Sequence, residues 1–265
     1  MSVVEFCALA SGSSGNCIYV GAGRTKLLID AGISCKKIAE GLEQLGTDPG
    51  EIDAILITHD HCDHIQGAAV FARKYNVPIY ATPLTMEFIC KKAVCPPGPQ
   101  LQMMVDPDSD FFVGGIHVMP FRISHDALDP VSYTVEADGE KIGFATDLGV
   151  YDENTVRALS DCDALYIEAN HDVNMLMLGS YSYSTKLRIN SPLGHLSNED
   201  CAALILRVRT ERLRHVVLGH ISKENNLEEL AYETVRQAIA SDRRFATETE
   251  LMVANRYDPS ALIRL

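Results

Sequence analysis

Three histidines and two aspartates fall within six consecutive positions of the stretch ITHDHCDHIQG (57–67). Imidazole and carboxylate are typical ligands of zinc, manganese and iron. The preceding AILIT is typical of a buried strand, and side chains two residues apart in an extended chain, such as His59 and His61, point the same way. A helix beginning near Asp63 and His64 would turn both side chains back toward the strand end. We therefore predict that these four side chains converge on one metal site.

The same alternation points Asp60 and Cys62 away from that site, so we do not expect them to be ligands. Two other predicted strands carry a candidate at their ends, Asp147 in GFATDLG and His220 in VVLGHIS. Because α/β layers assemble sites at the carboxyl ends of their strands, we expect both side chains to lie at the same edge as the cluster.

The other histidines divide into two groups. His125 in ISHDALDP, His171 in EANHDV and His195 in LGHLSN lie in polar segments near predicted strand or helix ends. His117 and His215 lie inside apparent strands, where a packed or surface histidine is the expected explanation.

The elements that must position these residues alternate along the chain. Apolar or β-branched runs bounded by Gly and Asp predict strands over 5–10, 17–22, 25–32, 54–59, 78–82, 115–121, 132–137, 141–147, 164–169, 215–220 and 250–256. Helical spacing predicts helices over 34–46, 65–76, 83–93, 152–161, 197–210 and 225–242. We expect Ser197 to cap the fifth helix, and Asn225 or Asn226 the sixth. This pattern favours two sheets covered by helices in a single domain, 1–265.

Composition narrows the class of protein. No apolar run approaches the roughly 18–20 residues that span a bilayer, and the amino-terminal stretch lacks the pattern of a secretory signal, so we expect a cytoplasmic protein. The eight cysteines are scattered without a CxxC pair, which favours reduced thiols over a disulfide scaffold and argues against a zinc ribbon.

The formal net charge of −13 opposes nonspecific attraction to polyanions, although a metal pair would supply local positive charge. Arginines do gather toward the carboxyl end of the chain, where we expect a solvated helix face. They are Arg207, Arg209, Arg212, Arg214, Arg243 and Arg244.

The candidate ligands follow one another in the order His59, His61, Asp63, His64, His125, Asp147 and His220. This order and spacing resemble the metal signature of the metallo-β-lactamase-fold hydrolases. The stretches LASGSSGNCIYV, LLIDAGIS, ISHDALDPVSYTV, EANHDVNML and GHLSNEDCA…LGHISKENN resemble its YycJ/WalJ/VicX subgroup, bacterial proteins related to the phosphodiesterase and nuclease branch.

The resemblance implies an α/β fold, an αββα four-layer sandwich of two mixed sheets flanked by helices, with two divalent metal ions at one edge. The ions would be Zn²⁺ or Mn²⁺, and iron is also compatible. The carried-over ligands are His59, His61 and His125 for one ion, Asp63, His64 and His220 for the other, and Asp147 as a bridge. No cysteine occupies a ligand position, which argues against an antibiotic-degrading lactamase.

Two such ions can lower the pKa of a water and stabilise charge that develops on a phosphodiester. The leaving oxygen then needs a proton, and our candidate donor is His195, since phosphodiesterase relatives carry a comparable histidine. Asp63 and His171 are the other catalytic candidates. Glu168 could orient a ligating imidazole, and His171 could touch substrate or be structural.

Two segments are candidates for substrate binding. In SGSSGN (11–16), Ser13, Ser14 and Asn16 could line a phosphate pocket, or the segment could be only a tight glycine turn; it is not a P-loop.

The second segment lies between His171 and His195. It offers two rings and two cations, which suit bases and backbone of a nucleic-acid strand, although ordinary packing would also explain them. These four residues are Tyr181, Tyr183, Lys186 and Arg188.

The function predicted from these features is a dinuclear-metal-dependent phosphodiesterase acting on nucleic acid, most plausibly a DNA exonuclease. One alternative is a hydrolase of small cyclic phosphodiesters or thioesters. The other is a non-catalytic regulatory protein that retains the fold. The acidic charge suggests that a protein partner recruits the chain to nucleic acid.

Overall fold

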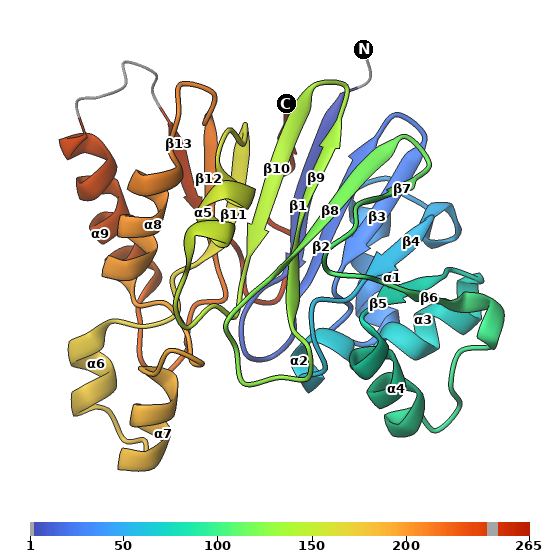
Figure 1. Ribbon diagram of the computed structural model, residues 1–265, viewed down its shortest axis with the longest axis horizontal. Helices are drawn as coiled ribbons and strands as arrows, with labels where there is room; N and C mark the ends of the chain where they lie inside the picture. The colour runs from blue at the N-terminus through green and yellow to red at the C-terminus, as the bar shows by residue number, and fades with distance from the viewer. Residues whose placement is uncertain (1–2, 243–248) are drawn as a thin grey trace.

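Two sheets packed face to face form the centre of the fold (Figure 1). The computed structural model describes residues 3–242 and 249–265, so Arg243 and Arg244 lie outside the described residues. The first sheet contains, in spatial order, β14 (Ile263–Arg264), β1 (Val4–Ala10), β2 (Cys17–Ala22), β3 (Thr25–Ile29), β4 (Ala54–Leu56), β5 (Ile79–Ala81) and β6 (Gln102–Met104). The second contains β13 (Glu250–Val253), β12 (His215–Gly219), β11 (Ala164–Glu168), β10 (Glu140–Ala145), β9 (Val131–Ala137), β8 (Ile116–Arg122) and β7 (Phe111–Val113).

Helices cover the outer faces of both sheets (Figure 1). Those packed on the first sheet are α1 (Cys35–Gln44), α3 (Ala68–Tyr75) and α4 (Pro83–Lys92). Those packed on the second are α5 (Glu153–Leu159), α8 (Asn198–Val208) and α9 (Glu228–Ser241). Three short helices lie at the lower edge in Figure 1: α2 (Cys62–Ile65), α6 (Val173–Leu178) and α7 (Tyr183–Ile189). One-turn 3₁₀ helices occur at Pro49–Glu51 and Pro99–Leu101.

Three apolar layers hold this arrangement together. The central layer lies between the sheets, where the rings of Phe6 and Phe144 meet edge to face with centroids 6.2 Å apart. The two outer layers lie between each sheet and its helices. The αββα four-layer sandwich predicted from the resemblance is therefore confirmed. Within the described residues, no helix is both long enough and apolar enough to cross a membrane.

Parallel strands determine where the polar loops gather. The strands β3 to β6 run parallel in the first sheet, and β10 to β13 run parallel in the second. Their carboxyl ends meet at one edge of the sandwich, where α2 also lies. The structure therefore brings the loops that follow β4, β10 and β12 together at this edge.

Every predicted strand range contains a strand of the structure, but several strands end earlier than predicted. Because β4 ends at Leu56 and β10 at Ala145, His59 and Asp147 lie in loops rather than in strands. The sequence prediction missed β6, β7 and β14, which have two or three residues each and lie at sheet edges. A short edge strand has only one partner and needs no apolar run, so it leaves little trace in the sequence.

The predicted helix over 65–76 corresponds to α3, which begins only at Ala68. Ile65 is the last residue of α2, and Gly67 separates the two helices. The backbone N–H of Gly67 donates to the carbonyl of Ala31 at 2.8 Å, and a Cβ at this position would lie 2.1 Å from the carbonyl oxygen of Ile33. Only glycine allows the loop after β3 to approach so closely, and this contact ends α2.

One of the two predicted helix caps is confirmed. The side chain of Ser197 accepts a hydrogen bond from the backbone N–H of Asp200 at 3.0 Å. The cap predicted at Asn225 or Asn226 is wrong, because α9 begins after Leu227 without a side-chain cap. Both asparagines are buried, and the amide of Asn226 donates to the carbonyl of Ala169 at 2.8 Å.

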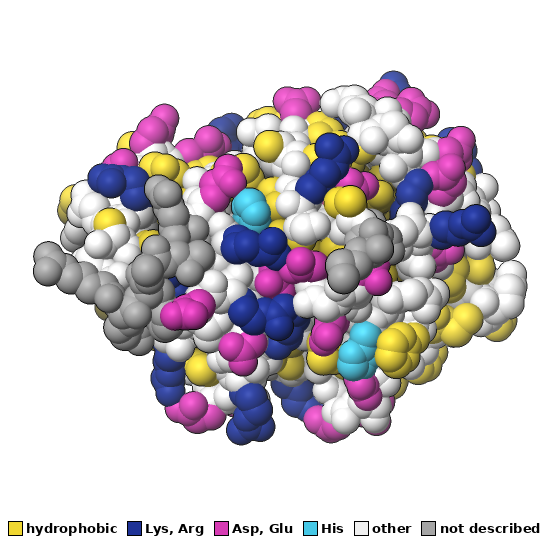
Figure 2. All heavy atoms as spheres, turned by 90° about the horizontal axis from the view of Figure 1, so that it is seen from above, with side chains coloured by type: hydrophobic (Ala, Val, Ile, Leu, Met, Phe, Trp, Pro, Cys, Tyr) yellow, Lys and Arg dark blue, Asp and Glu magenta, His cyan; other side chains and the backbone are white. Residues whose placement is uncertain are grey.

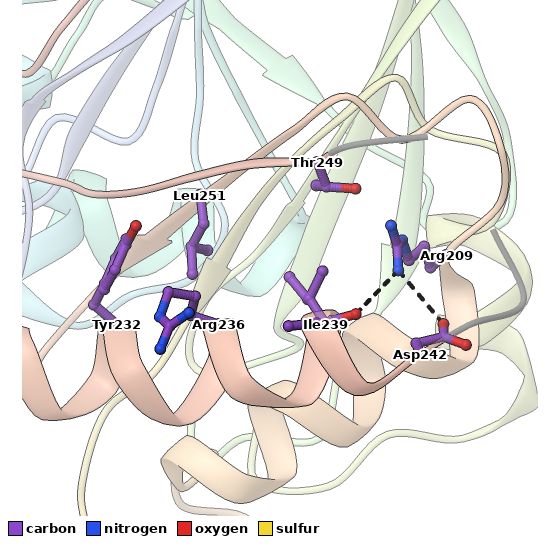
Figure 3. Close-up of a pocket in the computed structure, with 8 residues that line it drawn as sticks. Arg209, Tyr232, Arg236, Ile239, Asp242, Thr249 and Leu251 are labelled. Atoms are coloured by element: carbon purple, nitrogen blue, oxygen red, sulfur yellow. Dashed lines mark hydrogen bonds and ion pairs between the residues drawn. The ribbon is translucent and has the colours of Figure 1, made fainter. Parts of the chain in front are cut away.

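The described arginines of this group, Arg207, Arg209, Arg212 and Arg214, lie away from the loop edge. Figure 2 looks onto the upper edge of Figure 1, where basic and acidic side chains are interspersed. Arg212 and Arg214 pair with Asp163 at 2.5 and 3.3 Å. Arg209 is only 5% exposed, and it pairs with Asp242 at 3.6 Å at the carboxyl end of α9 (Figure 3), so the expectation of a solvated face is wrong for Arg209.

Candidate metal centre

Strand ends deliver the side chains of the site. Asp147 follows β10, His220 follows β12 and Asp30 follows β3, and each has a left-handed backbone, with φ of 58°, 51° and 60°. For residues other than glycine this conformation costs on the order of 1–3 kcal/mol, and it persists where surrounding contacts enforce it. All three side chains are buried at the same edge of the sandwich.

A first group of three imidazoles forms beside α2. Ligand atoms of His59, His61 and His125 all lie within 4.8 Å of one another. Nδ1 of His61 is 3.2 Å from Nε2 of His125. The structure therefore brings together the three residues that the resemblance assigns to one ion.

The second group contains a carboxylate. Asp63, His64 and His220 also offer ligand atoms within 4.8 Å of one another. Oδ2 of Asp63 is 3.7 Å from Nε2 of His64 and 3.6 Å from Nε2 of His220. These are the three residues that the resemblance assigns to the other ion.

Asp147 lies between the two groups. Its Oδ2 is 3.2 Å from Nε2 of His64, and its Oδ1 is 3.7 Å from Nε2 of His125. Burial raises the pKa of this carboxyl, but the nearby imidazoles of His220 and His64 outweigh burial and hold its pKa well below the usual range. Asp147 is thus an ionised carboxylate that faces both groups.

Several ligand-capable atoms here lack a hydrogen-bond partner. Within the described residues, Nε2 of His59, Nε2 of His220 and Oδ2 of Asp147 are buried and make no hydrogen bond. Buried polar atoms are normally paired, so unpaired atoms within these ligand groups indicate missing partners. A divalent cation satisfies them, and the nitrogen and oxygen donors suit zinc, manganese or iron.

Residues behind the site fix the imidazole orientations. Asp30 accepts from Nδ1 of His64 at 2.7 Å and from the backbone N–H of Thr58 at 2.9 Å. The hydroxyl of Thr58 lies 2.9 Å from Nδ1 of His59, and the carbonyl of Gly194 lies 3.1 Å from Nδ1 of His125. These contacts leave Nε2 of each imidazole for a metal ion.

Replacing Asp30 with asparagine should lower metal affinity about 10- to 100-fold, because the amide cannot hold His64 as a carboxylate does. Competition with a chromogenic chelator measures this affinity. An Asp48→Asn variant, altered in the exposed loop before the first 3₁₀ helix, is the control. Equal affinity of Asp30→Asn and the unaltered protein would contradict the role given to Asp30.

His195 and Glu168 form a pair beside the two groups. Nδ1 of His195 lies 3.2 Å from Oε2 of Glu168, and Nδ1 of His220 lies at the same distance from this oxygen. Burial raises the pKa of Glu168, but His195 and His220 outweigh it and lower the pKa to about 2. Glu168 is therefore a carboxylate that orients one candidate ligand and one candidate acid. Ligand-capable atoms of Glu168, His195, His220 and Asp147 also lie within 4.8 Å of one another.

His171 lies behind this pair and is fully buried. Its Nε2 is 3.4 Å from Oδ1 of Asn190, and it belongs to none of the ligand groups among the described residues. Burial lowers the pKa of His171, so the ring is neutral. The adjacent Asp172 caps α6 by accepting from the backbone N–H of Met175 at 2.7 Å. The structure thus places His171 against a loop residue rather than at the ligand atoms.

The residues expected to point away do so. Oδ1 of Asp60 accepts from the backbone N–H of Leu128 at 2.8 Å, and Cys62 is exposed. His117 pairs with Asp110 outside the site.

The SGSSGN segment forms a turn next to the site. Ser13 and Ser14 are exposed on it. Asn16 is buried: its Oδ1 accepts from the backbone N–H of Gly12 at 2.8 Å, and its Nδ2 lies 3.1 Å from Nε2 of His64. Asn16 therefore reaches the ligand cluster, whereas the two serines face solvent.

The segment between His171 and His195, for which the sequence predicts no helix, folds into α6, capped by Asp172, and α7, capped by Ser182. Tyr183 on α7 is 73% exposed.

Tyr181, just before α7, is half-buried. Nζ of Lys186 donates to the carbonyl of Met177 at 2.8 Å, which ties α7 to α6. Lys186 is thus engaged with the backbone in this structure.

Arg188 connects α7 to the ligand cluster. It pairs with Asp126 at 2.5 Å, and Asp126 in turn lies 3.5 Å from Nε2 of His125 and 4.0 Å from Nε2 of His61. Arg188 therefore links α7 to the candidate metal centre through Asp126.

Metal binding at neutral pH should release protons. Burial lowers the pKa of His64 and His220, but facing carboxylates outweigh burial: Asp147 and Asp30 raise the pKa of His64 well above its usual range, and Asp147 and Asp63 raise that of His220 to about 10. Both rings are thus protonated at pH 7 in the metal-free chain, and they must lose protons to bind a metal.

Calorimetric titration of metal-free protein in two buffers of different ionisation enthalpy measures this release. We expect different heats in the two buffers at pH 7. We also expect a smaller difference as the pH approaches 10, the pKa of His220, because a growing fraction of His220 has then lost its proton before the metal binds. Equal heats in both buffers at pH 7 would contradict the protonation described.

Comparisons with known proteins agree with this geometry. Residues 25–221 match the model of the beta-lactamase superfamily domain. The chain is 40% identical over 237 residues to "Exodeoxyribonuclease WalJ" of Streptococcus pneumoniae, covering 89% of this chain and 88% of that protein. It is 38% identical over 236 residues to "Exodeoxyribonuclease YycJ" of Bacillus anthracis, covering 89% of each. The crystal structure of the metallo-beta-lactamase fold protein YhfI from Bacillus subtilis superposes with a TM-score of 0.72 at 13% identity, covering 97% of this chain and 99% of that one.

Proposed function

Because this chain belongs to the metallo-β-lactamase superfamily, in one family with WalJ and YycJ, we propose that it is a metal-dependent exodeoxyribonuclease. The observation that carries this proposal is the pair of ligand groups around Asp147, with His195 and Glu168 beside them, in a chain alike over most of its length to two exodeoxyribonucleases. We propose further that residues 1–265 act as one domain in the cytoplasm.

Two divalent ions, zinc or manganese with iron also compatible, would be held by the two groups and Asp147. Bound there, such ions would lower the pKa of water and offset the negative charge that develops on a phosphodiester. The chain's own contribution is rigidity, because Asp30, Thr58 and Glu168 orient the imidazoles before any substrate arrives.

His195 is the proposed general acid. Glu168 accepts from its Nδ1, which leaves Nε2 as the nitrogen that gives a proton to the leaving oxygen. Its side chain is 15% exposed, so substrate can reach it.

Asp63 is the proposed acceptor of a proton from the attacking water. Burial raises the pKa of Asp63, but His220 and His64 outweigh burial and keep the carboxyl ionised at neutral pH. Its side chain is 25% exposed, in contrast to the 2% of Asp147. Asp63 can therefore meet water as well as contribute to the second group.

The chain has a formal net charge of −13, which opposes its approach to DNA. Because long-range repulsion opposes encounter with DNA, we propose that a protein partner recruits the enzyme to its substrate. Tight unaided binding to DNA at physiological salt, measured by fluorescence anisotropy, would contradict this part of the proposal.

A substrate panel tests the activity. Purified protein with Mn²⁺ or Zn²⁺ is incubated with end-labelled and internally labelled DNA, RNA and bis(p-nitrophenyl) phosphate, alongside a His61→Ala control. We expect mononucleotides to be released from DNA ends by the unaltered protein and not by the control. Cleavage of the small diester alone would support a small-molecule phosphodiesterase, and inertness toward all substrates would support a regulatory protein.

A further inference from the structure

A cavity of about 240 Å³ adjoins the ligand cluster and shares His195 with it. Its walls come from the loop after Asp147, with Gly149 and Tyr151, from the segment before α8, with Asn190 and Pro192, and from Asp200 on α8 itself. The imidazole that we propose as the general acid is thus also a wall of this cavity.

The walls are fixed by contacts inside the protein. The hydroxyl of Ser124 donates to the carbonyl of Pro192 at 2.8 Å, and the backbone N–H of Gly149 donates to the carbonyl of Ser124 at 2.9 Å. A Cβ at Gly149 would lie 2.3 Å from the carbonyl oxygen of Pro192, so the two loops are in close contact. Behind them, the buried ring of His171 contacts Asn190. A cavity with such walls is largely formed before a ligand binds.

The chemistry of the lining excludes a phosphate group. The lining residues include no lysine or arginine, and Asp200 contributes a carboxylate that would repel an anion. One oxygen of Asp200 accepts from the hydroxyl of Ser197 at 2.8 Å, which leaves the other available. An uncharged ligand with an N–H donor suits this lining.

The size of the cavity suits one planar ring system. Pockets that enclose drug-sized ligands measure roughly 300–1,000 Å³, so this cavity is too small for a whole nucleotide. Tyr151 is half-buried against the apolar layer beneath α5 and α8, and its ring therefore offers a supported surface for stacking. Asn190 adds an amide that can pair with a ring edge.

We propose that this cavity binds the base of the terminal nucleotide, stacked on Tyr151, while the scissile phosphodiester lies at the ligand cluster. This proposal rests on the proposed exodeoxyribonuclease function. It adds that the terminal base holds the DNA end in position at the ligand cluster. The carboxylate of Asp200 accepts from an exocyclic amino group, which cytosine carries at the position where thymine carries a carbonyl. The cavity therefore favours terminal cytosine over terminal thymine.

The first test compares oligonucleotides whose end carries either a base or an abasic sugar, at each end in turn. The unaltered, metal-loaded protein should show a KM about 10-fold lower for the base-bearing end, the effect of one base–aromatic stack. Tyr151→Ala should raise that KM to the abasic value, and Tyr151→Phe should retain the preference. Tyr232→Ala is the matched control, since Tyr232 lines the separate hollow between α9 and β13 in Figure 3.

The outcomes separate the two proposals. Absence of DNA cleavage by the unaltered protein would overturn the exodeoxyribonuclease itself. Cleavage with equal KM for base-bearing and abasic ends, or a preference that survives in Tyr151→Ala, would overturn the base subsite alone. If Tyr151→Ala does not fold, Asp200→Ala decides, because alanine offers no acceptor and the variant should lose the preference for terminal cytosine over thymine. An unchanged preference in that variant would overturn the subsite.

Discussion

Replacing His195 with alanine should lower the turnover of DNA ends about 100- to 10,000-fold, the effect of losing a general acid. The residue lies beside the ligand groups and pairs with Glu168 at 3.2 Å. Because it belongs to neither of the two groups that flank Asp147, the metal content should not change. Single-turnover kinetics, together with metal analysis of the same preparation, measures both quantities.

The choice of control decides how this result is interpreted. His117 pairs with Asp110 outside the site, so His117→Ala should retain both turnover and metal. If His195→Ala lost a metal ion as well as turnover, His195 would be a ligand, as its distance of 3.6 Å from Asp147 allows. If turnover stayed within a few-fold, the assignment of the acid would be wrong.

Replacing Asp147 with asparagine should have the largest effect of any single change in the site. The carboxylate is 2% exposed, lies between both groups, and faces His64, His125 and His220. Without its charge, three imidazoles lose the anion they share, and metal affinity falls at both groups. We expect turnover to fall about 1,000-fold or more, since several kcal/mol of transition-state stabilisation depends on the metal ions.

Asp60→Asn is the matched control for Asp147→Asn. Asp60 is also a buried aspartate beside the cluster, but it accepts from the backbone N–H of Leu128, and an asparagine side chain can still accept there. This variant should retain metal and turnover. Equal losses in the two variants would mean that Asp60, and not only Asp147, takes part in holding the metal ions.

The ligand cluster is the part of the site that can be predicted from the sequence. Its residues are polar, lie at the ends of apolar runs and alternate in a loop, so their approach follows from strand direction and side-chain period. The six candidates found in this way lie together in the structure with His125, which the resemblance added, in the two groups and around Asp147. The early end of β4 did not disturb this prediction, because an extended loop keeps the period of a strand.

The residues that orient the ligands could not be found in the same way. Asp30 reaches His64 only because β3 pairs with β4, and this pairing joins residues far apart in the chain. The stretch LLIDAG does place an acid at a strand end, which was the available signal for Asp30. Thr58 gave no such signal, since a threonine at the end of a strand is common in any sheet.

The sequence prediction missed helices α6 and α7 for a different reason. Each has only six or seven residues, too few for an apolar period to stand out from the polar loop around it. The cavity that they approach depends on the contact between Gly149 and Pro192, which no periodicity encodes. The cavity walls therefore depend on tertiary contacts of this kind, whereas the positions of the candidate metal ligands follow from the local sequence pattern.

Metal removal and reconstitution tests the central claim most directly. The protein is stripped with a chelator, its metal content is determined, and DNA-end hydrolysis is measured as Zn²⁺ or Mn²⁺ is added back in known ratio. We predict no hydrolysis by the stripped protein and recovery that is complete at two ions per chain. Full hydrolysis by protein that contains no metal, or binding of no divalent ion by the stripped chain, would contradict the account.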